Sequence, residues 1–430
     1  MKKLIRTSLF LLPALLLTGC NYTYVYNISG LEGGGQDDDV EEVDDAGTYD
    51  IKIWVDEKIV PLTQTQIATF IANNAGKYTI NLNIAPVSES NAASSMMQDV
   101  QQGADIFCFA QDQLARLKMT GALAKLPSVY ADTIANEMPK EAIDAASVNE
   151  EVYAFPITSD NGYFLYYDKS VVSEDAAKNM TTLIKACSDK GKKLYFGARG
   201  DGFYAASYFM ATGCYSKWSL NAETGKFDDV DDNYNSDGGK IAATGIKELD
   251  SDAVIARAEA SQFGGKGKAG AMISGIWDYE AVEKRIGENL ACAELPSYTV
   301  DGKDYHLSSF DGYKLLGVKP QVDPKKASVC RKIARFLVSE ECQTERFTIA
   351  SWGPTNIQSN KDPEIEKHQG LAALKAQHEY AQPQTQCPGE WFSTLAATAK
   401  DIKSSSSASD IANLLTRYDG SLQDILVSQD

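Results

Sequence analysis

The stretch GKAGAMISGIWDYEAV, residues 267–282, places a tryptophan in the turn between a predicted strand and a predicted helix. The small and apolar residues 268–275 predict a buried strand, and a helix is expected to run from Trp277 through EAVEKR. In open α/β sheets, ligands bind beyond the carboxyl ends of the strands. We therefore predict that Trp277 faces a binding cleft, the alternative being a tryptophan of the core.

Strands and helices alternate on both sides of this stretch, which implies crossover connections and sheets that are largely parallel. The sequence therefore predicts an α/β fold. Residues 226–240 are expected to form a loop. Predicted strands include YDIKIWV (49–55), KYTINLNIAP (77–86), ADIFCFA (104–110), KLYFGARG (193–200) and YKLLGVKP (313–320). Predicted helices include 62–76, 88–103, 202–213, 324–350, 363–378, 390–402 and 408–425.

The first residues have the pattern of an export signal. Three basic residues precede the apolar run LFLLPALLL, which is too short to span a membrane readily. The run leads into LTGC, which ends at Cys20. This ending resembles the lipobox of bacterial lipoproteins, in which the cysteine is lipidated. We expect a signal peptide at 1–19, lipidation of Cys20, and an acidic flexible tether at 20–47, since that segment is rich in glycine and aspartate.

Composition excludes one class of partner. Loss of residues 1–19 changes the formal net charge from −18 to −21, which argues against nucleic-acid binding. The roughly 380 residues that follow the tether are too many for one small core, so two lobes are expected. Seven cysteines remain after Cys20 and none forms a C-x-x-C pair. We expect few or no disulfide bridges and predict a monomer.

The sequence offers little support for a metal site, a cofactor or a catalytic site. The run GGKGKAG (264–270) lacks the spacing of a phosphate loop, and DDVDDNYNSDGG (228–239) lacks the glycine and the final glutamate of a calcium loop. No G-x-S-x-G motif occurs. Paired carboxylates of the kind used in glycoside hydrolysis leave no sequence signature, so a glycoside-acting enzyme stays open as an alternative.

Six segments in order resemble the solute-binding proteins of ATP-binding-cassette (ABC) sugar importers, specifically the maltose-binding-protein-like group. They are IKIWV, GADIFCFAQDQLARLKMTGALAKL, YAFPITSDNGYFLYYDKS, GKAGAMISGIWDYEAV, LSSFDGYKLLGV and GEWFSTLAATAKDI. The resemblance implies a two-lobed periplasmic-binding-protein-like fold of type II, with each lobe a mixed, mostly parallel sheet flanked by helices. It places the lobes at 48–158 plus 312–353 and at 161–310 plus 356–430. The chain would cross between them at 158–161, 309–312 and 351–355, and hinge motion there would close the lobes.

The resemblance also implies a carbohydrate site between the lobes. Aromatic rings would cover the apolar faces of the sugar, and carboxylates would accept its hydroxyl hydrogens. Two departures, Phe109 for a tryptophan and Gln113 for an arginine, argue against a strict maltose preference. A core role for Phe109 or Trp391, a helix cap at Asp112 and a turn at Asp160 are the competing interpretations. The implied binding residues are Phe109, Asp112, Asp160, Glu57, Lys58, Phe203, Tyr204, Trp391 and Trp277.

These features predict a lipid-anchored binding protein on the outer face of the cell membrane. It would capture an oligosaccharide, with an α-glucan as the first choice, and deliver it to a membrane permease. A surface glycan-binding lipoprotein without a transport partner is a second alternative beside the enzyme. Trp352 and Tyr313 are expected to pack between the lobes.

Overall fold

A computed structural model describes residues 44–221, 224–249 and 252–428 of the chain. The predicted signal peptide, Cys20 and most of the predicted tether lie outside these residues. One five-stranded sheet has the order β2-β1-β3-β17-β6, and we call the part of the chain around it the N-terminal lobe. Its strands are β1 (Gly47–Val55), β2 (Tyr78–Pro86), β3 (Ile106–Ala110), β6 (Ala154–Thr158) and β17 (Lys314–Val318).

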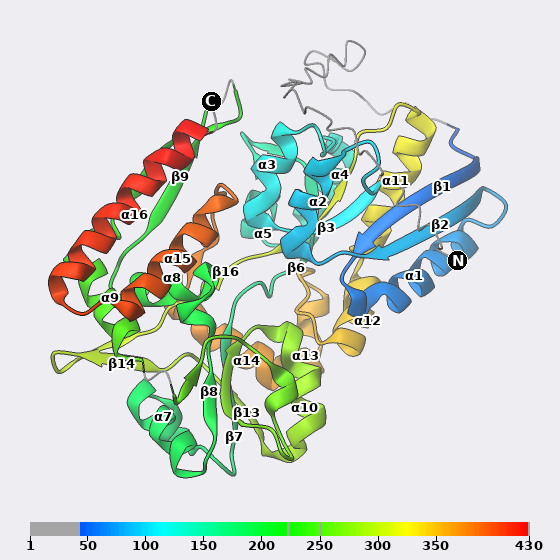
Figure 1. Ribbon diagram of the computed structural model, residues 1–430. Helices are drawn as coiled ribbons and strands as arrows, with labels where there is room; N and C mark the ends of the chain where they lie inside the picture. The colour runs from blue at the N-terminus through cyan, green and yellow to red at the C-terminus, as the bar shows by residue number, and fades with distance from the viewer. Residues whose placement is uncertain (1–43, 222–223, 250–251, 429–430) are drawn as a thin grey trace, which may run out of the picture. The chain divides into compact units, whose positions relative to one another are not determined.

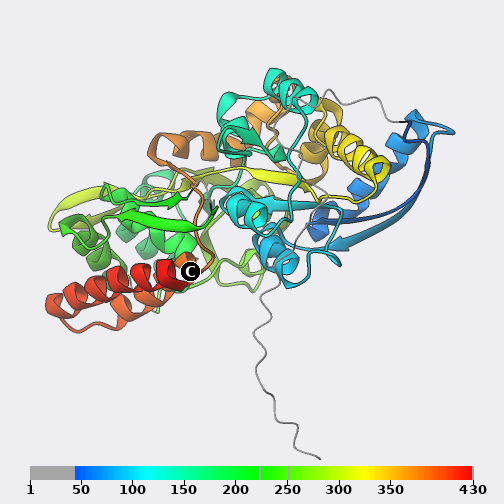
Figure 2. The same ribbon diagram turned by 90° about the horizontal axis from the view of Figure 1, so that it is seen from above.

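Helices flank this first sheet. α1 and α11 lie side by side and pack against β2 and β17 respectively (Figures 1 and 2). Asp323 caps α11 and Pro324 occupies its first turn, a combination that favours helix initiation. The helices of this lobe are α1 (Val60–Asn73), α2 (Ala92–Gln98), α3 (Leu114–Met119), α4 (Ser128–Glu137), α5 (Lys140–Ala145), α11 (Pro324–Leu337) and α12 (Glu340–Ala350), with a small hairpin of β4 (Ser147–Val148) and β5 (Glu151–Val152).

A second five-stranded sheet, with the order β11-β8-β12-β7-β13, is the centre of the C-terminal lobe. Its strands are β7 (Phe164–Asp168), β8 (Lys193–Tyr195), β11 (Val254–Ile255), β12 (Ala269–Ser274) and β13 (Leu290–Ala293). The last two helices, drawn in orange and red, run alongside each other (Figures 1 and 2). The helices that follow β7 in this part of the chain are α6 (Glu174–Ala177), α7 (Met180–Asp189), α8 (Gly202–Ala211), α9 (Asp237–Glu248), α10 (Tyr279–Ile286), α13 (Pro363–Lys367), α14 (Gln369–Gln377), α15 (Glu390–Ser404) and α16 (Ala408–Ser428).

Short strand pairs complete the C-terminal lobe. The pairs are β9 (Ser216–Leu220) with β10 (Phe227–Asp232), β14 (Ser297–Val300) with β15 (Lys303–His306), and β16 (Phe310–Asp311) with β18 (Gln382–Pro383). The pairing of β9 with β10 corrects the loop predicted for 226–240, since Phe227–Asp232 is a strand. A run of acidic residues has low strand propensity, but the partner strand overrides that preference.

Each sheet contains one strand that runs against the other four. In the first sheet this strand is β17, which pairs antiparallel with both β3 and β6. In the second it is β7, which pairs antiparallel with both β12 and β13. Both strands directly follow a segment predicted to cross between the lobes. A strand that enters a lobe from the crossings starts where the forward strands end, so it must run in the opposite direction.

The three predicted crossing segments lie together and are hydrogen-bonded to one another. The Asn161 amide donates to the Gly312 carbonyl at 3.0 Å, and the Ser159 amide donates to the Gly353 carbonyl at 3.0 Å. The Asp160 carboxylate accepts from the Gly353 amide at 2.6 Å. These hydrogen bonds connect the three crossing segments, which join the two sheets.

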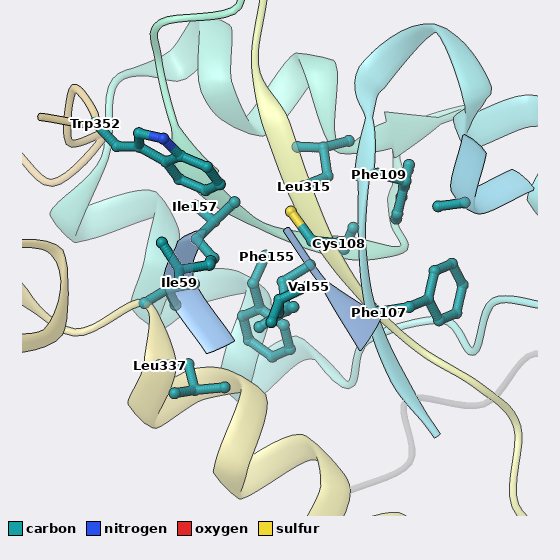
Figure 3. Close-up of a cluster of buried hydrophobic side chains, with 14 of the residues drawn as sticks. Val55, Ile59, Phe107, Cys108, Phe109, Phe155, Ile157, Leu315, Leu337 and Trp352 are labelled. Carbon is teal, nitrogen blue, oxygen red and sulfur yellow. The ribbon is translucent and has the colours of Figure 1, made fainter. Parts of the chain in front are cut away.

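Phe109 belongs to the core of the N-terminal lobe, which corrects its prediction as a sugar platform. Every residue of β3 is buried, as expected for a central strand covered on both faces. Phe107 and Phe109 point to one side of the strand and Cys108 to the other (Figure 3), and the two phenyl centroids are 5.6 Å apart. Because β3 is covered on both faces, Phe109 packs in the core from within the strand rather than lying beyond the strand end.

Folded structure begins before the predicted end of the tether at residue 47. The Asp45 side chain is fully buried and accepts hydrogen bonds from Tyr78, Ser328 and Lys332. Strand β1 starts at Gly47. The predicted tether therefore overlaps the folded lobe by its last residues.

Other features of the described residues bear on the sequence predictions. The seven cysteines after Cys20 are all free thiols, and six of them are buried. Among the helices in the described ranges, none is long and apolar enough to cross a membrane.

Candidate functional site

A cleft of about 900 Å³ lies between the two lobes, a size typical of small-molecule sites. β1 and β3 end at the cleft wall formed by the N-terminal lobe, and β12 ends at the wall formed by the C-terminal lobe. The carboxyl ends of strands from both sheets therefore face this space. The residues that line it include Asp56, Lys58, Glu89, Asp112, Arg116, Asn161, Phe203, Tyr204, Trp277, Lys314, Trp352, Gln384 and Phe392.

The wall formed by the N-terminal lobe is polar and carries carboxylates. Burial raises the pKa of the Asp112 carboxyl to about 6, while the nearby Arg116 guanidinium, 3.5 Å away, opposes that rise. Burial also raises the pKa of Glu89, against the opposing charge of Lys314. Two carboxyl groups at this wall are thus held out of bulk water, where hydrogen bonds to a ligand are stronger than in solvent.

The wall formed by the C-terminal lobe is aromatic. The Phe203 ring stacks on Phe310 with centroids 5.1 Å apart, and it contacts Tyr204 and Phe392 edge-on. Asp201 caps α8 by accepting from the Phe203 amide, which fixes the turn that presents these rings. The pairing of an aromatic wall with a carboxylate wall suits a ligand that has apolar faces and hydroxyl edges.

Trp277 lies in a single 3-10 turn, Ile276–Asp278, between β12 and α10. Its side chain is half-buried and lines the cleft. The indole ring folds back over Gly275, where any Cβ atom would collide with it. From the opposite lobe, the Lys58 ammonium donates to the Trp277 carbonyl.

Lys314 is the first residue of β17 and lies at the base of the cleft. Its side chain is almost fully buried, and its ammonium lies 3.5 Å from Asp160, 3.8 Å from the centre of the Trp352 ring and 5.7 Å from that of Trp277. Burial opposes the charged form, but the carboxylates of Asp160 and Glu89 prevail and raise the pKa of Lys314. A charged lysine therefore joins the crossings to the aromatic wall.

Comparison with known protein families identifies the fold that carries this cleft. Residues 65–373 match the model of the family described as bacterial extracellular solute-binding protein. The chain belongs to this family. In such a solute-binding protein, the space between the lobes is the expected position of the ligand.

Individual known proteins are similar to this chain in sequence or in fold. The chain is 24% identical to the galactooligosaccharide-binding protein of Bacillus subtilis, over 66% of this chain and 68% of the relative. It is 22% identical to the maltotriose-binding protein of Pyrococcus abyssi, over 74% and 69% of the two chains. The unliganded maltodextrin-binding protein MalE1 of L. casei BL23 superposes with a TM-score of 0.71 at 20% identity, covering 88% of this chain and 99% of that one. The fold is thus the two-lobed type II fold that the sequence predicted.

The structure brings five of the predicted binding residues of this solute-binding protein together at the cleft. They are Lys58, Asp112, Phe203, Tyr204 and Trp277. Two others are displaced from it. Glu57 is exposed to solvent and does not line the cleft, although its neighbours Asp56 and Lys58 do. Asp160 is fully buried among the crossings and serves them as a hydrogen-bond acceptor.

Trp391 is a core residue, which corrects its prediction as a stacking platform. Its side chain is 3% exposed, and the indole N–H donates to the Tyr418 hydroxyl at 3.0 Å between α15 and α16. The next residue, Phe392, lines the cleft instead. Adjacent positions on a helix point about 100° apart, so one residue of register separates the core side from the cleft side.

Sequence reasoning missed several cleft residues. Phe392 and Asp56 are each one residue away from a predicted site residue. The register of the predicted helix and strand was the signal that could have found them. Glu89, Lys314 and Gln384 carry no such signal, because they come from parts of the chain that only the fold brings together. Trp352 was expected to pack between the lobes, and the structure places its buried ring against Lys314 at the cleft.

Proposed function

We propose that this solute-binding protein captures an oligosaccharide in the cleft and delivers it to an ABC permease, with an α-glucan as the first candidate. The observation that carries the proposal is the pairing of aromatic rings on one wall with buried carboxylates on the other. A pyranose has apolar C–H faces that stack on rings and hydroxyl edges that donate to carboxylates. The relatives named for galactooligosaccharide and maltotriose, and a structural neighbour bound to maltotriose, support the same ligand class.

The proposal includes the way in which the protein is held at the cell surface. Cys20 would carry the lipid, residues 21–44 would form the tether, and the two lobes would act as a monomer in front of the permease. Acyl chains contribute about 0.8 kcal/mol per buried methylene, so two or three chains hold a folded domain on a membrane. Mass spectrometry of the membrane fraction tests this part. A Cys20→Ala variant that stays membrane-bound would argue against it.

Calorimetry of the purified protein tests the binding function. The panel comprises maltotriose, longer α-glucans, galacto-, xylo- and manno-oligosaccharides, and monosaccharides. We expect saturable heat with at least one oligosaccharide and no increase in reducing ends. At a ligand concentration one hundred times the Kd, unfolding should require about 2.7 kcal/mol more than without ligand.

Two outcomes contradict the proposal in different ways. Release of reducing ends, retained after repurification, would make the protein a glycoside-acting enzyme. Absence of both heat and a melting shift across the panel would favour a surface lipoprotein that does not bind these sugars.

A further inference from the structure

Side-chain amides gather where the segment 384–387 passes from the C-terminal lobe along the N-terminal lobe. Gln111, Asp112, Asn161, Gln384 and Gln386 form a connected set that we call the amide clasp. The Gln386 side chain donates to the Gln111 carbonyl at 2.8 Å and accepts from the Ala115 amide at 2.9 Å. These two bonds fasten the segment to the start of α3.

Gln384 is the centre of the clasp and is 3% exposed. Its Nε2 donates to Asp112 Oδ1 at 2.9 Å, and its Oε1 accepts from Asn161 Nδ2 at 2.7 Å. Its backbone amide donates to the Asp311 carbonyl at 2.9 Å, and its carbonyl accepts from the Gln111 side chain. Each nitrogen and oxygen atom of this residue therefore has at least one partner, in the N-terminal lobe or in the crossings.

The partners of Gln384 connect the cleft to the crossings. Asp112 lies in the cleft wall, whereas Asn161 and Asp311 belong to two of the three crossing segments. The Gln384 amide packs directly against the crossing at Gly312, because a Cβ atom added there would overlap Gln384 Oε1 unless that side chain moved. A change in the geometry of either crossing therefore displaces the Gln384 amide.

The carboxylate held by Gln384 keeps free acceptor capacity. An ionised carboxylate has about four lone-pair sites. Gln384 takes one on Oδ1, and the Arg116 guanidinium lies 3.5 Å from Oδ2. Gln384 itself also lines the cleft. A ligand hydroxyl that donates to Asp112 would therefore share this carboxylate with the Gln384 amide.

We propose that Gln384 is a positioning residue that orients the Asp112 carboxylate for the ligand and transmits occupancy of the cleft to the crossings. This inference rests on the proposed function, since it concerns a ligand hydroxyl at Asp112. The single amide group acts in both directions, because one end holds the carboxylate and the other end holds Asn161. Closure of the lobes and capture of the ligand are thereby linked at one residue.

A double-mutant cycle tests the inference on the intact protein. The variants are Gln384→Ala, Asp112→Ala and the pair, with binding measured by calorimetry for the oligosaccharide that binds wild type most tightly. Hydrogen bonds to charged groups support an expected tenfold to hundredfold loss of affinity in Gln384→Ala. In the Asp112→Ala background the same change should cost less than about threefold, because contacting residues are coupled.

Gln382→Ala is the matched control. Gln382 lies two residues earlier, and its side chain donates to the Cys214 carbonyl within the C-terminal lobe at 3.0 Å. We expect its affinity to stay within about twofold of wild type. Gln384→Met keeps the side-chain volume without hydrogen bonds, so it serves if the alanine variant does not fold.

Hydrogen exchange gives a second readout. Without ligand, exchange at 309–313 and 384–387 should be faster in Gln384→Ala than in Gln382→Ala, and ligand should protect these segments in wild type only. Wild-type affinity in Gln384→Ala, or an equal loss with and without Asp112, overturns this inference alone. A wild-type protein that binds no sugar overturns the proposed function and this inference together.

Discussion

Two tryptophans show how little the nearest residues decide about a side chain. Trp277 and Trp391 both occur in a Gly-x-Trp sequence at the start of a helix. Trp277 lies in the turn beyond the end of β12 and lines the cleft, whereas Trp391 is in the first turn of α15 and faces α16. Trp277 lines the cleft because it lies beyond the end of a sheet strand, and Trp391 is buried because a neighbouring helix covers it.

Trp277→Ala should remove most of the sugar affinity. A ring that packs against a ligand at the centre of a site can contribute 2 kcal/mol or more, which corresponds to a loss of roughly thirtyfold or more. Calorimetry with the preferred oligosaccharide measures this. Tyr380→Ala is the control, since this exposed ring stacks on His306 away from the cleft. Equal affinities in wild type and Trp277→Ala would remove Trp277 from the site.

Trp391→Ala should lower the stability of the protein rather than act on the sugar site. Truncation of a buried tryptophan typically costs about 3–5 kcal/mol, and here it also leaves the Tyr418 hydroxyl without its indole donor. Urea denaturation should show this loss of stability. Trp391→Phe, which keeps a ring in the core, should retain near-normal sugar affinity. A stable Trp391→Ala protein that has lost binding would restore the sequence prediction.

At the level of elements, the aromatic wall depends on the close approach of α15 to the start of α8. Gly202 begins α8, and a Cβ atom there would collide with the Phe392 carbonyl of α15. Phe203, the next residue of α8, and Phe392 itself form adjacent parts of the cleft wall. The absence of a side chain at Gly202 therefore allows the close approach of the two helices that carry these rings.

Gly202→Ala should separate the two helices and lower both stability and affinity. Overpacking of a tight contact costs about 1–3 kcal/mol. Thermal unfolding and calorimetry measure the two effects. The matched control is Gly420→Ala in α16, where no atom lies within 4 Å of the added methyl group. That variant should gain up to about 1 kcal/mol from helix propensity. Wild-type stability and affinity in Gly202→Ala would show that α15 can shift without disturbing the aromatic wall.

For the whole molecule, Asp45 anchors the beginning of the folded chain. Burial alone would raise its pKa, but hydrogen bonds from Lys332, Lys77, Ser328 and Tyr78 outweigh burial and hold the pKa well below its usual range. These donors come from β2, α11 and the residue before β2. One carboxylate thus joins the first folded residues to two elements of the N-terminal lobe.

Asp45→Asn should destabilise the protein by about 2 kcal/mol at neutral pH, the contribution of hydrogen bonds to a charged group. Because the native pKa is depressed, this contribution is complete above the unfolded pKa of about 3.9. It is lost as the pH falls through the lower native pKa. Denaturant unfolding from pH 7 down to pH 2 measures the difference between variant and wild type. Asp44→Asn, at an exposed neighbouring position, is the control. A pH-independent difference would assign the effect to shape rather than charge.

Much of the fold followed from local patterns, and about half of the site followed from the family resemblance together with the position of Trp277. Strand and helix alternation and the order of the landmark segments led to the two-lobed fold, because each element records its own periodicity. Lys58, Asp112, Phe203, Tyr204 and Trp277 all line the cleft. The rule that ligands lie beyond the carboxyl ends of strands predicted this for Trp277, and the family resemblance implied it for the other four. The prediction for Phe109 was wrong because β3 is buried on both faces, so a residue inside this strand packs in the core.

The sequence by itself determined most of the elements, their order and the resemblance to the family, because these depend on residues close together in the chain. Only the tertiary structure decided which side of a helix or strand meets the cleft, as Trp391 and Phe392 show. It also brought Gln384 to Asp112 across 272 residues of chain, and Lys314 to Trp352. Contacts of that separation depend on the packing of whole lobes and leave no periodic trace in the sequence.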